Sequence, residues 1–367
     1  MKVRTNAVKL LSASISLLVS GAASAQSSVT LYGVVDVGVE FANHQPGAGD
    51  TVARVSSGNI AGSRWGIRGT EDLGGGLKAL FVLESGFDPD TGKSGQAGRL
   101  FGRSAYVGLV GQWGSILLGR QQGSFFDFVG NFDPMTLAPK YSVFTQDAAY
   151  VQRADNTVKY VGNFGGLTVS SFYSFGADST VVNGSEVPGS PKLGREFGGY
   201  ITYNLRALSL AIAYDELNTG TTTLNPDATA RRVTAAATYA IGPTKLFAGY
   251  RWARAFDGGI IPGSIAGNQN QGSNLYWAGV NWQVTPAIVL TGAAYYQDFK
   301  NTGSDPWLFV LNADYAFSKR THAYSSIGYT KNKGTSNLGF FDSGKSFENT
   351  NPGQNQLGAV IGVRHSF

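Results

Sequence analysis

The acidic and basic residues in and around one irregular segment are the part of this chain that could do chemistry. Residues 121–156 carry Asp127, Asp133 and Asp147. Four basic residues flank these aspartates in the sequence: Arg103, Arg120, Arg153 and Lys159. Opposed carboxylates and guanidinium groups would set up a transverse field that sorts solutes by charge. The chemistry offered is therefore filtering, with no covalent step.

The shape expected of this segment follows from its pattern. Residues 121–156 show no sustained alternation and are rich in Phe and Tyr. An irregular stretch of about thirty residues in a compact domain is more often functional than idle. Its aromatic residues indicate that it packs against other structure. We therefore expect it to fold into the lumen of a membrane β-barrel, where its carboxylates would face arginines across a narrow aqueous pore.

The surrounding chain alternates between apolar and polar residues. In residues 29–41, valine, leucine and phenylalanine occupy one parity, whereas Thr30, Tyr32, Asp36 and Glu40 occupy the other. This pattern predicts a strand with one apolar and one polar face. About sixteen such segments occur, an even number that is typical of bacterial single-chain barrels. They are residues 29–41, 63–71, 77–87, 102–110, 115–122, 157–162, 167–176, 194–204, 208–218, 231–240, 244–254, 274–284, 287–298, 307–317, 322–332 and 356–367.

The connections between these segments alternate in length. Turns of a few residues, such as 163–166, alternate with long Gly-, Asn-, Asp- and Ser-rich stretches such as 177–193 and 333–355. Short periplasmic turns and long external loops produce this asymmetry in outer-membrane barrels. No linker divides the chain, so we expect a single domain over residues 26–367.

The beginning of the chain is a processing segment. Basic residues Lys2, Arg4 and Lys9 precede or flank an apolar core at residues 10–19, and small residues at 23–25 form a cleavage site. We expect a signal peptide over residues 1–25. Its removal takes three of the 29 basic residues, leaving 26 against 24 acidic ones, and lowers the net charge from +5 to +2. The basic pI of 9.2 is therefore no sign of a nucleic-acid partner.

Composition narrows the class further. The chain has 50 glycines, no cysteine and a mean hydropathy of −0.08. Such a chain is too polar for a helical membrane protein but suits a barrel with one apolar and one wet face. Without cysteine there is neither a disulfide framework nor a thiolate metal site. The three histidines are scattered, so we expect no metal and no cofactor.

Strand parity also assigns two arginines to the lumen. Arg64 and Arg68 share the parity opposite to Trp65 and Ile67. An arginine that faces lipid at mid-membrane would cost about 2–4 kcal/mol. We therefore expect Arg64 and Arg68 to point inward if Trp65 faces lipid.

The last strand and several internal blocks resemble a known family. Residues 357–367 read LGAVIGVRHSF, and a closing strand that ends on Phe367 resembles the assembly signal of outer-membrane barrels. The blocks SSVTLYGVVDVGVE, SRWGIRGTEDLGGGLKALFVLESGF, GRSAYVGLVGQWGSILLGRQ and RADNTVKYVG resemble the general bacterial porins, especially the betaproteobacterial type. The resemblance covers essentially the whole mature chain.

The resemblance implies a fold, a location and a function. The fold would be a transmembrane antiparallel β-barrel, all-β, of about 16 strands, with a third loop folded inward. The protein would be a homotrimer in outer-membrane lipid and would pass ions and small hydrophilic solutes by passive diffusion, without enzymatic activity. A weak anion preference or near-neutral selectivity is expected.

The resemblance also implies which residues form the constriction. The wall arginines would be Arg64, Arg103 and Arg153, with Arg68 and Arg120 nearby. The loop acids would be Asp127 and Asp133, together with Asp147. Asp133 also precedes Pro134, so it could simply begin a turn.

Three other functions remain open from the residues. One is a substrate-specific uptake channel for an organic anion or a sugar. Another is an outer-membrane barrel enzyme such as a lipase or protease. The last is a secreted soluble β-protein or adhesin.

Overall fold

The computed structural model describes residues 28–177, 186–223, 225–261, 272–300, 302–340 and 350–367. The expected signal peptide at residues 1–25 lies outside this part of the chain. Within it, no helix is both long and apolar enough to cross a membrane.

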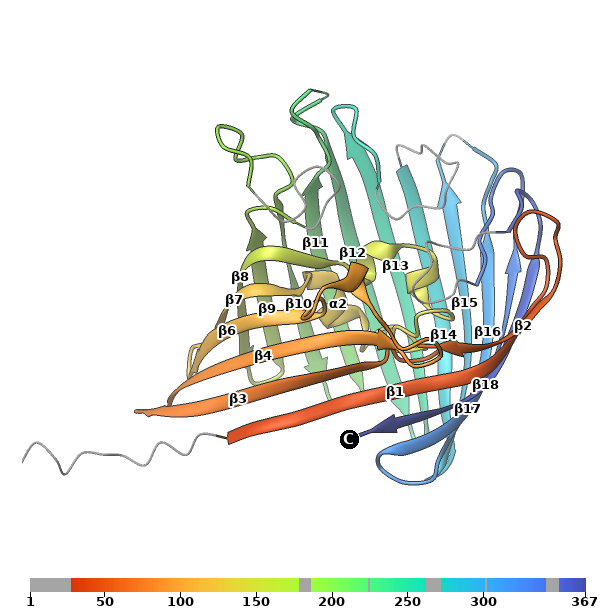
Figure 1. Ribbon diagram of the computed structural model, residues 1–367, viewed down its shortest axis with the longest axis horizontal. Helices are drawn as coiled ribbons and strands as arrows, with labels where there is room; N and C mark the ends of the chain where they lie inside the picture. Colours follow the sequence, from red (N-terminus) through yellow and green to blue (C-terminus); the bar gives the residue numbers. More distant parts are fainter. Residues whose placement is uncertain (1–27, 178–185, 224, 262–271, 301, 341–349) are drawn as a thin grey trace, which may run out of the picture.

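The described residues form one closed antiparallel barrel (Figure 1). The first strand, β1 (Ser28–Ala42), pairs with the last, β18 (Gln356–Ser366), so that Val39 lies opposite Ile361 and the sheet has no open edge. Sixteen strand positions surround the axis over the described residues, as the alternation predicted. The other strands are β2 (Val52–Ser57), β3 (Arg64–Gly74), β4 (Leu77–Asp88), β5 (Lys93–Ser94), β6 (Ser104–Gly111), β7 (Gly114–Gln122), β8 (Arg153–Phe164), β9 (Leu167–Ser174), β10 (Glu196–Leu205), β11 (Leu208–Asn218), β12 (Thr229–Ile241), β13 (Thr244–Phe256), β14 (Gly272–Thr285), β15 (Ile288–Phe299), β16 (Trp307–Ala316) and β17 (Thr321–Lys331).

One barrel position is divided between two strands. Both β2 and β3 pair with β1, β2 along its second half and β3 along its first. Residues 58–63 interrupt the position because their backbone turns inward: the N–H groups of Ile60 and Ala61 donate to the Asp36 carboxylate (3.2 and 2.9 Å). The alternation had predicted only the second part of this strand. The very short β5 pairs with β4 outside the barrel ladder.

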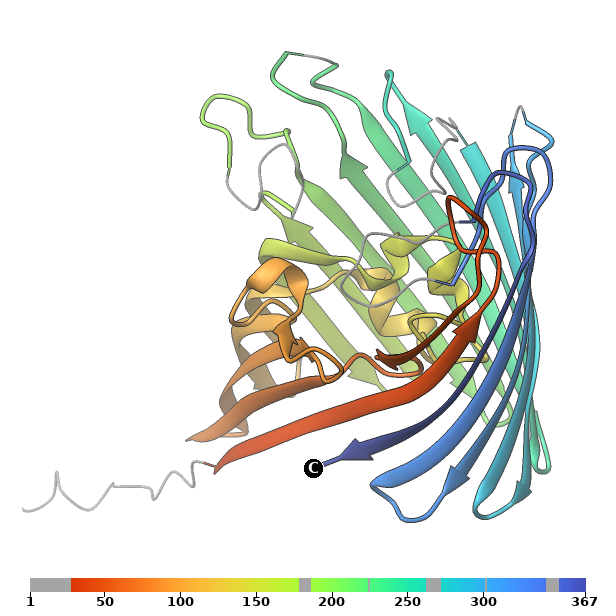
Figure 2. The same ribbon diagram turned by 45° about the vertical axis from the view of Figure 1, so that its right-hand side comes forward.

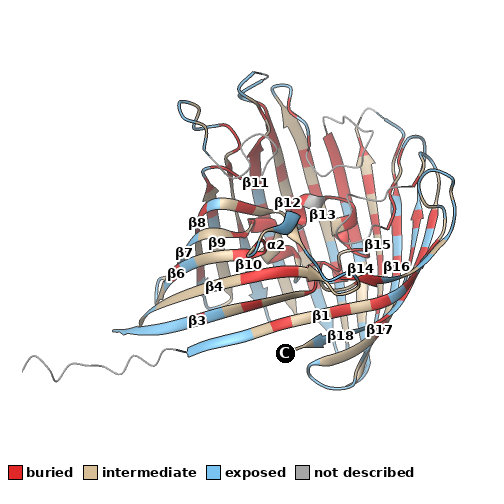
Figure 3. Ribbon diagram, viewed as in Figure 1, coloured by how far each residue is buried: buried red, intermediate tan, exposed pale blue. Residues whose placement is uncertain are grey.

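Burial follows the predicted two-residue period (Figure 3). On β11 the side chain of Ile212 is 53% exposed on the outer surface, whereas its neighbours Ala211 and Ala213 are buried. On β1 the polar parity faces inward, and Asp36 and Glu40 are fully buried. The apolar outer face can contact lipid, while the inner face carries the polar groups.

The irregular segment lies inside the barrel (Figures 1 and 2). It contains α2 (Ser124–Val129) and two 3-10 turns, η2 (Val143–Thr145) and η3 (Ala148–Val151). Trp277 of β14 donates its indole N–H to the Phe132 carbonyl (2.9 Å). The largest cluster of buried apolar side chains lies between this segment and the wall, and it includes Phe128, Tyr150 and Leu275. The aromatic residues of the segment therefore pack against the barrel wall, as their abundance indicated.

Candidate functional site: a charged constriction

A cavity of about 900 Å³ lies between the inner segment and one side of the barrel. Four arginines from separate elements line its wall: Arg64, Arg103, Arg153 and Arg364. The inner segment supplies a mostly uncharged opposite side, and its lining residues are Phe126, Asp127, Gly130, Asn131, Pro134, Met135, Thr136, Leu137, Pro139 and Phe144. The cavity is thus bordered by a basic wall and a largely neutral loop.

Three of these arginines lie where a strand begins after an irregular segment. Arg64 begins β3 directly after the inward turn of residues 58–63, Arg153 begins β8 directly after the inner segment, and Arg103 directly precedes β6. Each follows a segment that leaves the regular ladder. The geometry therefore gathers side chains that are far apart in the sequence.

Glu84 of β4 is the acidic partner of this cluster. Arg103 donates through Nε to Glu84 Oε1 (2.6 Å), and Arg64 Nε lies 3.6 Å from Glu84 Oε2. Tyr32 also donates to this carboxylate (3.0 Å). One negative charge is therefore shared by two guanidinium groups, so the cluster keeps an excess of positive charge.

Arg153 belongs to the same cluster. Its guanidinium carbon lies 6.0 Å from the centre of the Phe126 ring, a cation–π arrangement. The ring comes from α2, so it connects the inner segment to the basic wall.

The remaining two expected wall arginines lie elsewhere. Arg68 is nearer the short-turn end of β3, over the Tyr32 ring at 5.1 Å, and does not line the cavity. Arg120 donates to Asp155 Oδ1 (2.6 Å) and to the Gly102 carbonyl (2.8 Å). It also does not line the cavity.

The loop acids do not oppose the basic wall as expected. Asp127 lines the cavity but forms an ion pair with Lys159 of the adjacent strand β8. Asp133 is 1% exposed and accepts hydrogen bonds from the Tyr295 hydroxyl (2.7 Å) and the Leu137 N–H (2.8 Å). The expectation that Asp133 faces arginines across the pore is therefore wrong. A buried carboxylate needs donors close by, and the loop and wall supply them.

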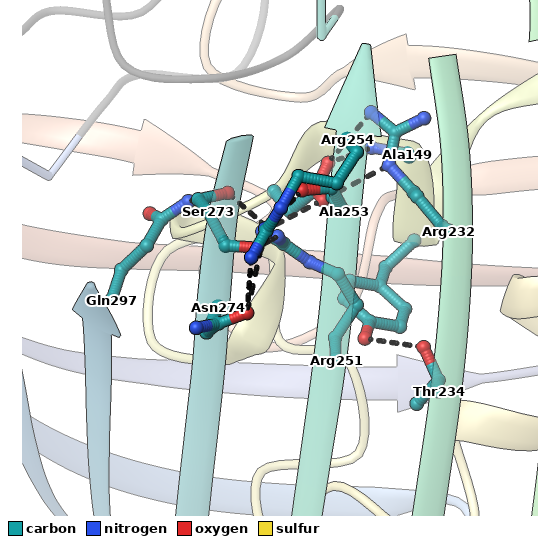
Figure 4. Close-up of polar contacts among 11 residues, drawn as sticks. Ala149, Arg232, Thr234, Arg251, Ala253, Arg254, Ser273, Asn274 and Gln297 are labelled. Atoms are coloured by element: carbon teal, nitrogen blue, oxygen red, sulfur yellow. Dashed lines mark hydrogen bonds and ion pairs between the residues drawn. The ribbon is translucent and has the colours of Figure 1, made fainter. Parts of the chain in front are cut away.

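Asp147 does bind arginines, but not the expected ones. Its carboxylate pairs with Arg232 of β12 (3.1 Å) and Arg251 of β13 (3.0 Å), and all three side chains are buried. Arg251 also donates to Ser273 Oγ (2.6 Å), and the Tyr150 and Thr234 hydroxyls are 3.1 Å apart (Figure 4). Asp147 thus anchors the end of the inner segment to the wall.

A second ion pair anchors the middle of the inner segment. Lys140 donates through Nζ to Glu40 Oε2 of β1 (2.9 Å), and both side chains are buried. Together with Asp147, this contact holds the inner segment to opposite sides of the barrel.

Burial changes the acidity of Asp133. Removal from water raises the pKa of Asp133 to about 6, although hydrogen bonds from Tyr295 and the Leu137 and Val143 N–H groups oppose the shift.

Sequence reasoning missed several charged residues of the lumen. The inner wall includes Arg232, Arg251 and Glu84, and the cavity lining includes Asp314 and Arg364. Their signal was parity, since each falls on the inward face of its strand. Asp314 is paired with His322 (2.6 Å) and lies 3.6 Å from Arg364.

The lining of the cavity holds one more arginine than acidic residues. Four arginines face three acids, Glu84, Asp127 and Asp314, and each acid has a basic partner. In the described residues no group of His, Asp and Glu side chains could hold a metal ion.

The chain is similar in sequence to a family of bacterial proteins and in structure to a solved member of known fold. The sequence model described as Gram-negative porin matches residues 11–335. Outer membrane porin protein 32 of Delftia acidovorans is 32% identical, with 96% of this chain and 97% of that protein covered. An outer membrane porin protein of Bordetella pertussis is also 32% identical, over 98% of this chain and 99% of that protein. The solved structure of an anion-selective porin from Comamonas acidovorans superposes with a TM-score of 0.80 at 29% identity, covering 93% of this chain and 100% of that one.

Proposed function

Because this chain belongs to the Gram-negative porin family, we propose that its constriction passes small anions more readily than cations. The protein is a diffusion porin of the outer membrane, through which ions and small hydrophilic solutes pass passively. The proposal rests mainly on the cavity wall, where four arginines outnumber the three acids: Arg64, Arg103, Arg153 and Arg364.

The selection works through charge on one side of the pore. Arg64 and Arg103 share Glu84, so at least one guanidinium charge is uncompensated beside the passage. The opposite surface includes Asn131, Met135 and Leu137, and its one acidic lining residue, Asp127, is paired with Lys159. Low-dielectric walls concentrate the field in a narrow opening and raise the local anion concentration. An anion would pass from one guanidinium to the next without losing all its water.

We assign the pore no catalytic step. The charged residues of the constriction are engaged with one another, and their arrangement supports filtering. A substrate-specific uptake channel would differ in having a saturable site. The flux of one organic anion or sugar would therefore level off at low concentrations of that solute, whereas flux through a diffusion pore stays linear.

The outer surface supports a homotrimer. The outer faces of β6 and β7, and of β18 beyond β1, β3 and β4, are mainly aliphatic, and their exposed residues include Val107, Leu109, Ile116, Leu118 and Ile361. The outer face of β14–β16 instead carries stacked rings, including Tyr296 and Trp307 at 4.5 Å. Aromatic rings at interfacial depth mark contact with lipid. We infer that the aliphatic face is the contact between copies.

The two ends of the chain fit export and assembly. We propose that residues 1–25 are removed as a signal peptide. Phe367 continues the closing ladder, because its N–H and carbonyl exchange hydrogen bonds with Gly33 of β1 (3.1 Å each). Its ring also lies over Gly33, which has no side chain in the way. This position fits the proposed role of Phe367 as an assembly signal.

Planar-bilayer recording tests the proposal. Purified protein should open channels whose zero-current potential in a salt gradient has the sign of anion preference. A cation-selective potential, or no channels at all, would contradict it.

A further inference from the structure

A groove runs along the outer surface of the barrel over β8, β9 and β10. Its volume is about 590 Å³, and its lining residues include Val158, Tyr160, Ser171, Tyr173, Arg195 and Phe197. This is the lipid-facing side of the barrel, because Val158 of β8 is 41% exposed. Ile201, which shares the parity of Phe197 on β10, is 47% exposed. The groove thus opens where acyl chains would pack.

Small residues between large rings create the groove. Ser171 of β9 lies opposite Tyr160 of β8 on one side and opposite Gly199 of β10 on the other. Two residues further along β9 toward the long loops, the outward-facing Tyr173 pairs with Phe197 of β10. The floor is therefore short side chains, and the sides are aromatic rings.

One end of the groove is basic. Arg195 precedes β10 at the long-loop end of the strand, and its guanidinium carbon lies 5.5 Å from the centre of the Phe197 ring. Arg231 of β12 lies close by, because both arginines contact one carboxylate: Arg195 at 3.6 Å and Arg231 at 2.8 Å from Glu216. Two guanidinium groups thus share one negative charge on the outer surface.

These charges face outward, which makes them unusual. Glu216 shares the parity of Tyr214 and of the lipid-exposed Ile212 on β11, and the Tyr214 hydroxyl donates to it (2.9 Å). The Arg195 and Arg231 side chains are 29% and 38% exposed. Charges on the lipid face are costly near the membrane centre and tolerated near the interface. Their place at the external rim puts them at the level of lipid headgroups.

We propose that this groove binds a phosphorylated anionic lipid of the outer leaflet. One acyl chain would lie along Ser171 between Tyr160, Tyr173 and Phe197, and a headgroup phosphate would accept hydrogen bonds from Arg195 and Arg231. Guanidinium groups match phosphate oxygens in geometry and charge. The groove supplies apolar contact and the arginines supply charge, so the site recognises both parts of one molecule.

Native mass spectrometry of the whole protein in detergent would test this site. Diphosphorylated lipid A and phosphatidylcholine would be added separately at equal concentration, and inorganic phosphate would serve as the headgroup without chains. The variants are the double substitution Arg195→Ala with Arg231→Ala, and Ser171→Phe, which fills the groove without changing charge. Arg206→Ala is the matched control, because Arg206 lies in the short turn at the other end of the β10–β11 hairpin.

The expected result separates the two parts of the site. Wild type and Arg206→Ala should retain lipid A over phosphatidylcholine, and the double arginine variant should lose about tenfold or more of that retention. Ser171→Phe should also weaken the binding of lipid A. Inorganic phosphate at the same concentration as the lipid should not displace lipid A. Equal retention by all four proteins, or equal binding of both lipids to wild type, would overturn the proposal. Folding of each variant is checked independently by channel formation in a bilayer.

Discussion

The ring of Phe340 lies against the ring of Tyr141, with centroids 5.1 Å apart. Phe340 belongs to the long connection between β17 and β18, whereas Tyr141 belongs to the segment inside the barrel. The Phe340 ring fits over Gly328 and Gly358, which pair directly across β17 and β18 and have no side chains to exclude it. An external loop therefore touches the segment that narrows the pore.

This contact predicts that Phe340 steadies the inner segment. Phe340→Ala would remove a fully buried ring, a change that costs about 3–5 kcal/mol in a packed site. The inner segment should then fluctuate more, and single-channel recordings should show more frequent brief closures and greater current noise. The lipid-facing Phe309, which is 41% exposed, provides a matched phenylalanine. Noise that is the same in Phe340→Ala and Phe309→Ala would show that the contact does not hold the segment.

The Asp147 anchor predicts a large stability effect. Asp147→Asn would remove the carboxylate charge that Arg232 and Arg251 share, and breaking a buried ion pair costs about 3–5 kcal/mol. The unfolding temperature should fall and the pore conductance should change. Asp227→Asn is the control, because Asp227 forms an exposed ion pair with Lys192 that is worth at most about 1 kcal/mol. Similar melting of the two variants would refute the anchor.

Asp133 predicts that the hold on the inner segment depends on pH. Its pKa is about 6 in the docked segment, against an ordinary value of 3.8. The docked state therefore binds more protons than a released state between these values, so docking is fully favoured below about pH 4 and weakens as pH rises through about 6. Closures should become more frequent over this range in wild type.

The Asp133→Asn variant removes the titrating group and isolates this effect. Its closure frequency should vary much less between about pH 4 and pH 7 than that of wild type. If both proteins respond equally to pH, another group is responsible.

The closing strand predicts a role for Phe367 in assembly. Phe367→Ala would keep the backbone hydrogen bonds to Gly33 but lose the ring that lies over it. Folded barrel should accumulate more slowly in cells, which the heat-dependent shift in gel mobility measures. Phe317→Ala, an exposed aromatic outside the closing strand, should fold at the wild-type rate.

The sequence allowed the strands to be predicted because a barrel wall imposes a strict two-residue period. The Asp36 parity and the outward Ile212 follow from that period alone, as does the approximate number of strands. The aromatic residues around Asp133 also indicated that the inner segment packs. These are local properties that neighbouring residues can reveal.

The partners of the inner segment were not predictable in the same way. Asp147 meets Arg232 and Arg251 about 85 and 104 positions further along the chain, and their pairing depends on where a non-repeating segment crosses the lumen. Strand parity carries the signal that both arginines face inward, but it holds no information on which acid they meet. The inward turn at Ile60 escaped notice because Asp36, which holds it, lies on another strand.

We propose that the basic wall of the constriction sets the preference for anions. The most direct measurement is the zero-current potential in a KCl gradient at low ionic strength, where screening is weakest. Wild type should show anion preference, and Arg103→Ala should shift the potential toward cations, because Glu84 then loses its 2.6 Å partner. Arg68→Ala, on β3 but outside the cavity, should leave the potential unchanged. A wild-type potential that favours cations, or an Arg103→Ala potential equal to wild type, would contradict the account.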